Sequence, residues 1–189
     1  MNSVYIFGAR PGIMGSVPAA PAERMGGADM PHDMLVKLYE VAEKPELCRK
    51  LEGKEISVTR ALPADKGRVV QFVQNNFGDV WAHECSYAFT AHPVSCFIAA
   101  RQKKVIGFAC YNTAAKDFFG PMGVYEKYRR TGIGEALLRA CLTALRSDGY
   151  AYAVIGPAED SAGFYAKTVG ATLIDDSYPG VYRNLISAD

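Results

Sequence analysis

A basic segment with two glycines, at residues 124–134, is the part of this chain best suited to hold an anion. It reads Val-Tyr-Glu-Lys-Tyr-Arg-Arg-Thr-Gly-Ile-Gly and leads into a strongly apolar helix pattern. Gly132 and Gly134 leave the first N–H groups of that helix open to an anion, and the helix dipole favours negative charge there. Lys127, Arg129 and Arg130 add positive charge. The pattern predicts a phosphate or pyrophosphate site, the alternative being a solvated basic turn before a glycine-capped helix.

The cysteines and histidines show no catalytic or metal-binding spacing. There are five cysteines, without a Cys-x-x-Cys pair, and three scattered histidines. Cys96, Cys110 and Cys141 stand in apolar runs, where a free cysteine behaves as a small hydrophobic residue. His83 lies two residues from Cys85, but this spacing alone does not make a nucleophilic pair. We therefore expect a reduced, cytoplasmic protein with no metal site and no catalytic thiol.

The composition excludes several classes of protein. The 189 residues are 49% apolar and carry 21 Lys and Arg against 20 Asp and Glu, a net charge of +1. Such a chain is too apolar and too balanced in charge to be disordered. The balance predicts no nucleic-acid partner, and no apolar run approaches the roughly 20 residues of a membrane span. A small molecule is therefore expected as partner, ahead of a basic protein tail.

The hydrophobic periodicity predicts a series of helices and strands after residue 33. Helices are expected over about 34–42, 46–51, 65–78, 81–91, 134–147 and 159–169. Strands are expected over 55–62, 94–101, 105–113, 117–125, 150–155, 171–175 and 181–186. This order of elements along the chain contains hairpins and at least one strand-helix-strand crossover. A mixed sheet flanked by helices is the expected α/β fold.

Residues 1–33 differ from the rest because glycine, proline and alanine dominate them. Such a stretch cannot hold a helix or a central strand, so we expect a poorly ordered N-terminal extension. Its glycines do not have the spacing of a dinucleotide-binding loop, and Met30 or Met34 is a candidate for the natural start. Residues 34–54 are expected to form a short helical lead-in, and residues 55–189 the folded domain.

Residues 129–134, Arg-Arg-Thr-Gly-Ile-Gly, resemble the acetyl-CoA-binding signature Arg/Gln-x-x-Gly-x-Gly/Ala of the GNAT superfamily of N-acetyltransferases. Residues 122–124, Met-Gly-Val, resemble the strand whose backbone meets the pantetheine arm in that family. Residues 164–171 resemble the family's Phe-Tyr-x-Lys…Gly-Phe segment, although Ala171 replaces the usual aromatic residue. The resemblance covers about residues 55–186. It implies a mostly antiparallel sheet of about six to seven strands, with a V-shaped splay at the cofactor site.

The resemblance implies transfer of an acetyl group from acetyl-CoA, without a metal, to a primary amine of a small molecule by direct attack in a ternary complex. It also implies that the N–H groups of Met122 and Val124 polarise the thioester carbonyl. Two alternative functions stay open: a protein lysine or N-terminal acetyltransferase, and a non-catalytic acyl-CoA-binding module. A second copy of the chain, forming a homodimer, is a candidate partner. The residues implied in cofactor binding are Met122, Gly123, Val124, Arg129, Arg130, Thr131, Gly132, Ile133 and Gly134.

Two side chains are expected to move protons in such a reaction. Tyr165 matches the family's tyrosine, and a phenol can protonate the departing CoA thiolate as a general acid. Glu84 ranks first as the base that deprotonates the amine, ahead of Asp117 and Glu126, with a water chain as the alternative. Four aromatic residues are candidates for an apolar wall around the acceptor: Trp81, Tyr87, Phe89 and Tyr111. For at least half of them, packing in the core is the alternative role.

Overall fold

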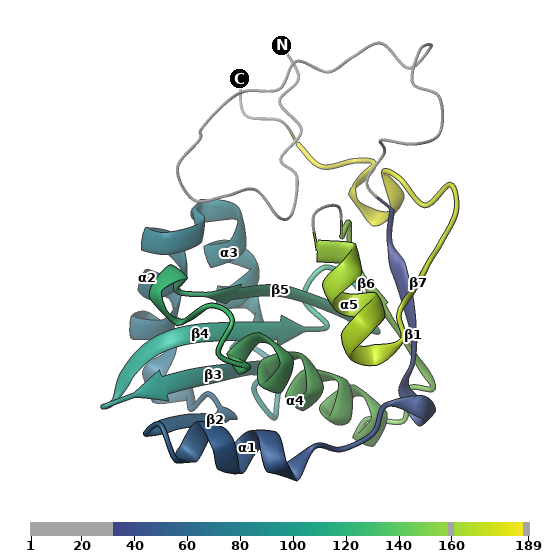
Figure 1. The fold of residues 1–189 in the computed structure, drawn as a ribbon. Coiled ribbons are helices and arrows are strands. Elements are labelled where there is room, and N and C mark those ends of the chain that lie inside the picture. The colour runs from purple at the N-terminus through teal and green to yellow at the C-terminus, as the bar shows by residue number, and fades with distance from the viewer. Residues whose placement is uncertain (1–31, 159–160, 187–189) are drawn as a thin grey trace. The chain divides into compact units, whose positions relative to one another are not determined.

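The computed structural model describes residues 32–158 and 161–186 (Figure 1). The chain divides into two compact units. The larger unit runs from Lys37 to Val154, and the smaller joins the described residues up to Val36 to those from Ile155 onward. The poorly ordered extension expected at the N-terminus falls almost wholly on residues 1–31, which lie outside the described residues. Within the described ranges, no helix has both the length and the apolar character that crossing a membrane requires.

The larger unit is built on strands that lie side by side in chain order: β2 (Ile56–Arg60), β3 (Cys96–Arg101), β4 (Lys104–Tyr111), β5 (Phe118–Val124) and β6 (Tyr152–Ile155). Strands β2 to β5 pair antiparallel. The β3–β4 hairpin turns through Gln102 and Lys103, whose φ angles of 49° and 61° are those of a tight hairpin turn. With β1 and β7 of the smaller unit, the described residues hold seven strands. The expected mixed, mostly antiparallel architecture flanked by helices is confirmed.

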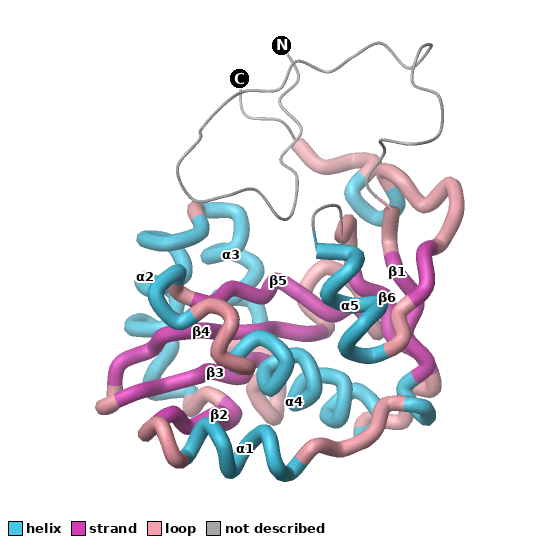
Figure 2. Tube along the Cα trace, viewed as in Figure 1, coloured by secondary structure: helices cyan, strands magenta, loops and turns pink. Residues whose placement is uncertain are grey.

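The α-helices of the larger unit cover both faces of these strands, as Figure 2 shows: α1 (Pro45–Glu52), α2 (Lys66–Phe77), α3 (Asp79–Ala88) and α4 (Ile133–Ser147). Helices α2 and α3 pack on the face that carries Phe108 and Cys110. Helix α4 packs on the opposite face at Gly107, where an added Cβ would lie 3.2 Å from Leu137 Cδ1 and 3.3 Å from Ile133 Cγ2. The small residue in β4 therefore lets the start of α4 approach the sheet closely.

Helix α4 buries the broad apolar face that its sequence predicts. The buried leucines and the cysteine of this face are at most 1% exposed: Leu137, Leu138, Cys141, Leu142 and Leu145. The helix is consequently held along its length, and its N-terminus has a defined position at the end of β5.

The smaller unit contains α5 (Ala162–Val169) and two short strands, β1 (Met34–Lys37) and β7 (Thr172–Leu173). The two strands pair antiparallel, with Met34 opposite Leu173. Just before β1, Asp33 donates its N–H to Ser177 Oγ at 2.7 Å and accepts the N–H of Ile174 at 2.9 Å. The start of the described chain is therefore fastened to its end.

The helix expected over residues 34–42 is wrong. The structure has β1 there, followed by a 3-10 turn at Leu38–Glu40. Met34, Val36 and Leu38 are at most 2% exposed, and this spacing of two belongs to a strand. The same apolar residues also fit a helical spacing, and it is the partner strand β7 that selects the extended form.

The strand expected over residues 181–186 is also wrong. A 3-10 turn at Gly180–Tyr182 takes its place, followed by irregular chain. The aliphatic side chains of this segment are at least 49% exposed, and that of Ile186 is 90% exposed. The segment therefore lacks the buried face that would stabilise a strand.

Candidate functional site

The predicted anion-binding loop lies at the end of β5 and folds back on that strand. A short turn follows the strand, and α4 begins at Ile133. Arg129 Nε donates a hydrogen bond to the Val124 carbonyl at 3.2 Å. Thr131 Oγ1 donates to the Tyr128 carbonyl at 2.6 Å. The structure thus brings the loop and the strand residues proposed for cofactor binding together.

Gly132 is the residue from which α4 starts, and both its backbone and its surroundings require a glycine. Its φ is +99°, and an added Cβ would lie 2.9 Å from Leu47 Cδ1. The first turn of the helix is closed by Ala136, whose N–H donates to the Gly132 carbonyl at 3.1 Å. The N–H groups of residues 133–135 therefore have no acceptor within the helix. At the start of a helix of 15 residues, this is the anion-binding geometry that the sequence predicts.

Glu135 lies in the first turn of α4, where an unpaired carboxylate would repel a phosphate, but two cationic side chains bind it. Glu135 Oε1 accepts hydrogen bonds from Lys44 Nζ at 2.8 Å and from Arg139 Nε at 2.9 Å. Burial raises the pKa of Glu135, but the two cationic donors outweigh it and leave the pKa below its ordinary value. Arg129 and Arg130, the charged residues nearest the helix start in the loop, are both exposed and positive.

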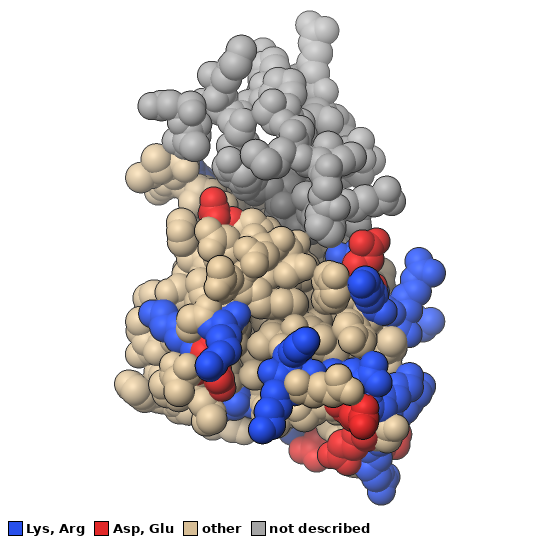
Figure 3. Space-filling view, turned by 90° about the vertical axis from the view of Figure 1, so that its left-hand side faces the viewer, with Lys and Arg blue, Asp and Glu red and all other residues tan. Residues whose placement is uncertain are grey.

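Charged side chains of both signs are mixed on one face of the molecule. Figure 3 shows Lys and Arg side chains standing beside Asp and Glu side chains on the face that it draws, without one unbroken basic surface. This mixture agrees with the net charge of +1. A compact anion such as a pyrophosphate suits a local site of this kind better than an extended polyanion.

Two residues of β5 near the loop turn their backbone groups away from β4. Tyr125 donates its N–H to the Ile106 carbonyl at 2.8 Å, which makes these residues a hydrogen-bonded pair of the β4–β5 ladder. Such pairs alternate with non-bonded ones, so Gly123 also turns its backbone groups toward β4. Met122 and Val124 turn theirs away from β4. This is the edge of β5 that faces β6, the next strand of the sheet. The sequence resemblance implies that the N–H groups of Met122 and Val124 meet the thioester carbonyl there.

Gly123 is covered by an aromatic group that sequence reasoning missed. An added Cβ at Gly123 would lie 2.5 Å from Phe77 Cζ, so the ring rests directly on the strand. Phe77 stacks on Trp81, with ring centroids 5.6 Å apart, and contacts Phe108 at the same centroid distance. Phe77 ends a helix distant in sequence, and no local pattern could have linked it to β5. The only sequence signal is the glycine itself.

The structure divides the aromatic residues expected in an acceptor wall. Trp81 belongs to the group around Phe77. Phe89 and Tyr111 are buried in the core, and the Tyr111 hydroxyl accepts a hydrogen bond from Arg60 Nη1 at 2.8 Å. Tyr87 is 59% exposed. Core packing is therefore the role of Phe89 and Tyr111.

Among the three candidate bases, Glu84 has the environment best suited to taking up a proton. It lies half-buried on α3, and burial raises its pKa to about 7. Burial also raises the pKa of Asp117, but the backbone of that residue closes a turn, with its N–H donated to Asn112 Oδ1 at 2.8 Å. Glu126 is exposed. A carboxyl group that titrates near neutrality can act as a general base, which keeps Glu84 first.

Tyr165 belongs to the smaller unit, whereas the loop, β5 and Glu84 belong to the larger one. It lies on α5 and is 8% exposed, with its ring edge-on to Phe164 at a centroid distance of 5.2 Å. Burial raises the pKa of its hydroxyl above the ordinary value. The phenol therefore carries its proton at neutral pH, as a general acid must.

The mixed sheet and the open start of α4 are features that comparison with known proteins connects to one family. The sequence profile of the acetyltransferase (GNAT) family matches residues 67–171, more than half of the chain. The protein therefore belongs to the GNAT acetyltransferase family, whose members use acetyl-CoA. No curated protein matches the chain.

Solved structures share this fold at low sequence identity. A glucosamine N-acetyltransferase region of a fungal multi-domain β-N-acetylglucosaminidase is 15% identical over 76% of this chain and 20% of that one, with a TM-score of 0.60. A GCN5-related N-acetyltransferase from Sphaerobacter thermophilus is 15% identical over 76% of this chain and 48% of that one, with a TM-score of 0.59. One from Kribbella flavida is 15% identical over 78% of this chain and 56% of that one, with a TM-score of 0.53. The chain thus matches about half or less of these longer chains.

Proposed function

We propose that this protein transfers an acetyl group from acetyl-CoA to a primary amine of a small molecule, by direct attack within a ternary complex. The observation that carries the proposal is the junction of β5 and α4. There, the N–H groups of residues 133–135 lack helical acceptors, next to a strand end whose Met122 and Val124 backbone groups face away from β4. Family membership supports the same chemistry.

The loop supplies the binding groups for the cosubstrate. The helix start and the side chains of Arg129 and Arg130 would hold its pyrophosphate, and Gly132 and Gly134 keep other side chains away. The N–H groups of Met122 and Val124 would hold the carbonyl oxygen of the acetyl group. Acetyl-CoA itself supplies an acetyl group activated as a thioester.

The chain's own residues then move two protons. The carboxylate of Glu84 takes a proton from the substrate ammonium, because an amine attacks only through its free electron pair. The C–N bond forms as the C–S bond breaks, and the nitrogen releases its second proton to solvent. In this proposal the departing sulfur takes its proton from the Tyr165 phenol, and solvent later restores both groups. Tyr165 and Glu84 are therefore the proposed acid and base.

A panel of primary amines tests the proposal. Each amine is mixed with the protein and acetyl-CoA, and release of free thiol is followed against a sample without amine. Turnover with small amines, and none with lysine peptides or peptide N-termini, is the expected result. Turnover with peptides alone would identify a protein acetyltransferase. Tight CoA binding without turnover on any amine would identify a non-catalytic acyl-CoA-binding module.

A further inference from the structure

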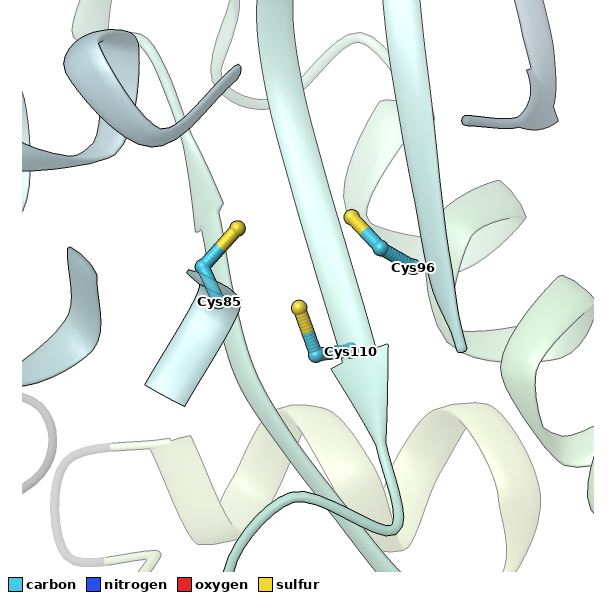
Figure 4. Close-up of side chains that lie close together, drawn as sticks. All are labelled: Cys85, Cys96 and Cys110. Atoms are coloured by element: carbon cyan, nitrogen blue, oxygen red, sulfur yellow. The ribbon is translucent and has the colours of Figure 1, made fainter. Parts of the chain in front are cut away.

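Three buried thiols, none of which the proposed function uses, converge in the core of the larger unit. Cys85 lies on α3, Cys96 on β3 and Cys110 on β4, and each is 0% exposed. Their Sγ atoms all lie within 4.8 Å of one another. Figure 4 shows the three sulfur atoms directed toward a common space between the helix and the two strands.

The sheet register fixes this convergence. Cys96 and Cys110 stand directly opposite each other on β3 and β4. The neighbouring pair is hydrogen-bonded, since Tyr111 donates its N–H to the Ser95 carbonyl at 3.0 Å. Cys96 and Cys110 therefore form a non-bonded pair, the position at which opposing side chains lie closest. Helix α3 then places Cys85 over the two strand residues.

The surroundings of the three thiols are apolar. The same buried cluster includes Val69, Val73, Val94 and Phe108. Burial raises the pKa of the Cys110 thiol well above its ordinary value, which favours the neutral form. A guest in this space must therefore bind sulfur, accept three ligands and leave no net charge behind.

We propose that Cys85, Cys96 and Cys110 form a binding site for trivalent arsenic. Arsenous acid is uncharged near neutral pH, so it can enter an apolar core without the cost of stripping water from a cation. Three thiolates balance the charge of one As(III), and a three-coordinate arsenic needs no fourth ligand. Zinc would require a fourth ligand and would leave the buried complex negatively charged.

The reaction balances without an oxidant or reductant. Each S–H bond breaks and each As–O bond of As(OH)3 breaks, three As–S bonds form, and three water molecules leave. Arsenic stays in the +3 state. Because the thiols are wholly buried, entry requires α3 to open locally from the sheet, so uptake is expected to be slow.

The test uses the full chain, reduced with a phosphine so that all five cysteines are free, and incubated with sodium arsenite. Native mass spectrometry should show one arsenic retained per chain, and thermal unfolding should shift upward. X-ray absorption at the arsenic edge should show three As–S bonds and no As–O bond. Fully reduced protein that retains no arsenic after prolonged incubation, or an arsenic with oxygen in its shell, would overturn the proposal.

Variants identify the cysteines involved. Cys85→Ala should lose arsenic retention, while Cys48→Ala, which changes the exposed cysteine, and Cys141→Ala, which changes a buried cysteine outside the group, should keep it. Retention that survives Cys85→Ala but disappears with either control would refute the site. If Cys85→Ala fails to fold, the X-ray absorption spectrum of the parent protein tests the site, because only three As–S bonds without As–O bonds agree with it. Uptake that excess Zn2+ blocks would show a four-coordinate cation site and would equally refute it.

Discussion

The ring of Phe77 occupies the space in which a side chain at residue 123 would have to lie, because an added Cβ at Gly123 would stand 2.5 Å from Phe77 Cζ. Gly123 sits between the two residues whose N–H groups are proposed to hold the acetyl carbonyl. The contact therefore presses an aromatic ring from α2 against the strand segment on which that geometry depends.

Replacing Gly123 with alanine should lower the free energy of unfolding by about 1–3 kcal/mol, because a methyl group overfills this contact. The measurement is equilibrium denaturation. Gly67→Ala is a matched control, since an added Cβ there meets nothing within 4 Å. In the double variant Gly123→Ala with Phe77→Leu, part of the loss should be recovered. A single Gly123→Ala variant as stable as its parent would show that the ring is free to move aside.

Gly132→Ala should weaken CoA binding by calorimetry, because its Cβ strains the backbone at the helix start and meets Leu47. Gly149→Ala is the matched control. Gly149 has almost the same φ, +97°, with nothing near its Cβ position, and it follows the other end of α4. Both variants should lose stability by about 1 kcal/mol from backbone strain. Equal CoA affinity in the two folded variants would remove the loop from the binding site.

Glu84→Gln should slow turnover by at least about 100-fold if Glu84 is the base. In the parent, kcat/KM should rise with pH through about 7, where the carboxylate forms, and this limb should vanish in the variant. Glu126→Gln, which alters an exposed carboxylate, should keep the limb. A Glu84→Gln variant that keeps both the rate and the pH profile would point to a water chain as the base.

Glu84 should also make stability depend on pH. Burial raises its folded-state pKa from 4.5 to about 7, so between these values the folded state binds more protons than the unfolded state. Stability should therefore fall as pH rises from about 4.5 to about 7 and level off above. Glu84→Gln should lack this decline and be more stable than the parent at pH 8. Parallel stability curves for parent and variant would contradict the burial of this carboxyl group.

Tyr165→Phe should keep the fold and CoA affinity while turnover per folded molecule drops by at least roughly tenfold. The change removes little besides the O–H. Tyr152→Phe is the control, because Tyr152 is 45% exposed and its hydroxyl contacts only an exposed Tyr39 hydroxyl at 3.4 Å among the bonds described. A Tyr165→Phe rate within a factor of about two of the parent, where chemistry limits the rate, would exclude a general-acid role.

A chain shortened to begin at Met34 should be less stable than one shortened to begin at Pro31. The shorter chain loses three hydrogen bonds, each worth about 1 kcal/mol: those that Asp33 makes with Ser177 and Ile174, and the one that the His32 carbonyl accepts from Ala158. Thermal unfolding of the two purified chains measures the difference. Identical melting temperatures would mean that the pairing of β1 with β7 needs no support from Asp33.

The loop at residues 129–134 and helix α4 could be predicted from the sequence because their causes are local. Glycines open the helix start, basic residues flank it, and the apolar stripe of α4 repeats with the helical period. Each of these depends on residues within a few turns of one another. The family resemblance rests on the same short segments, and the family match confirms it.

Only the tertiary structure decided the features that join distant segments. Strand β1 is extended because β7 pairs with it, although its apolar spacing also suits a helix. Phe77 meets Gly123, and Cys85 meets Cys96 and Cys110, through packing of helices on the sheet. The raised pKa of Glu84 likewise comes from burial by neighbours. Sequence spacing reports contacts along the chain, whereas desolvation and side-chain convergence arise only when separate elements pack together.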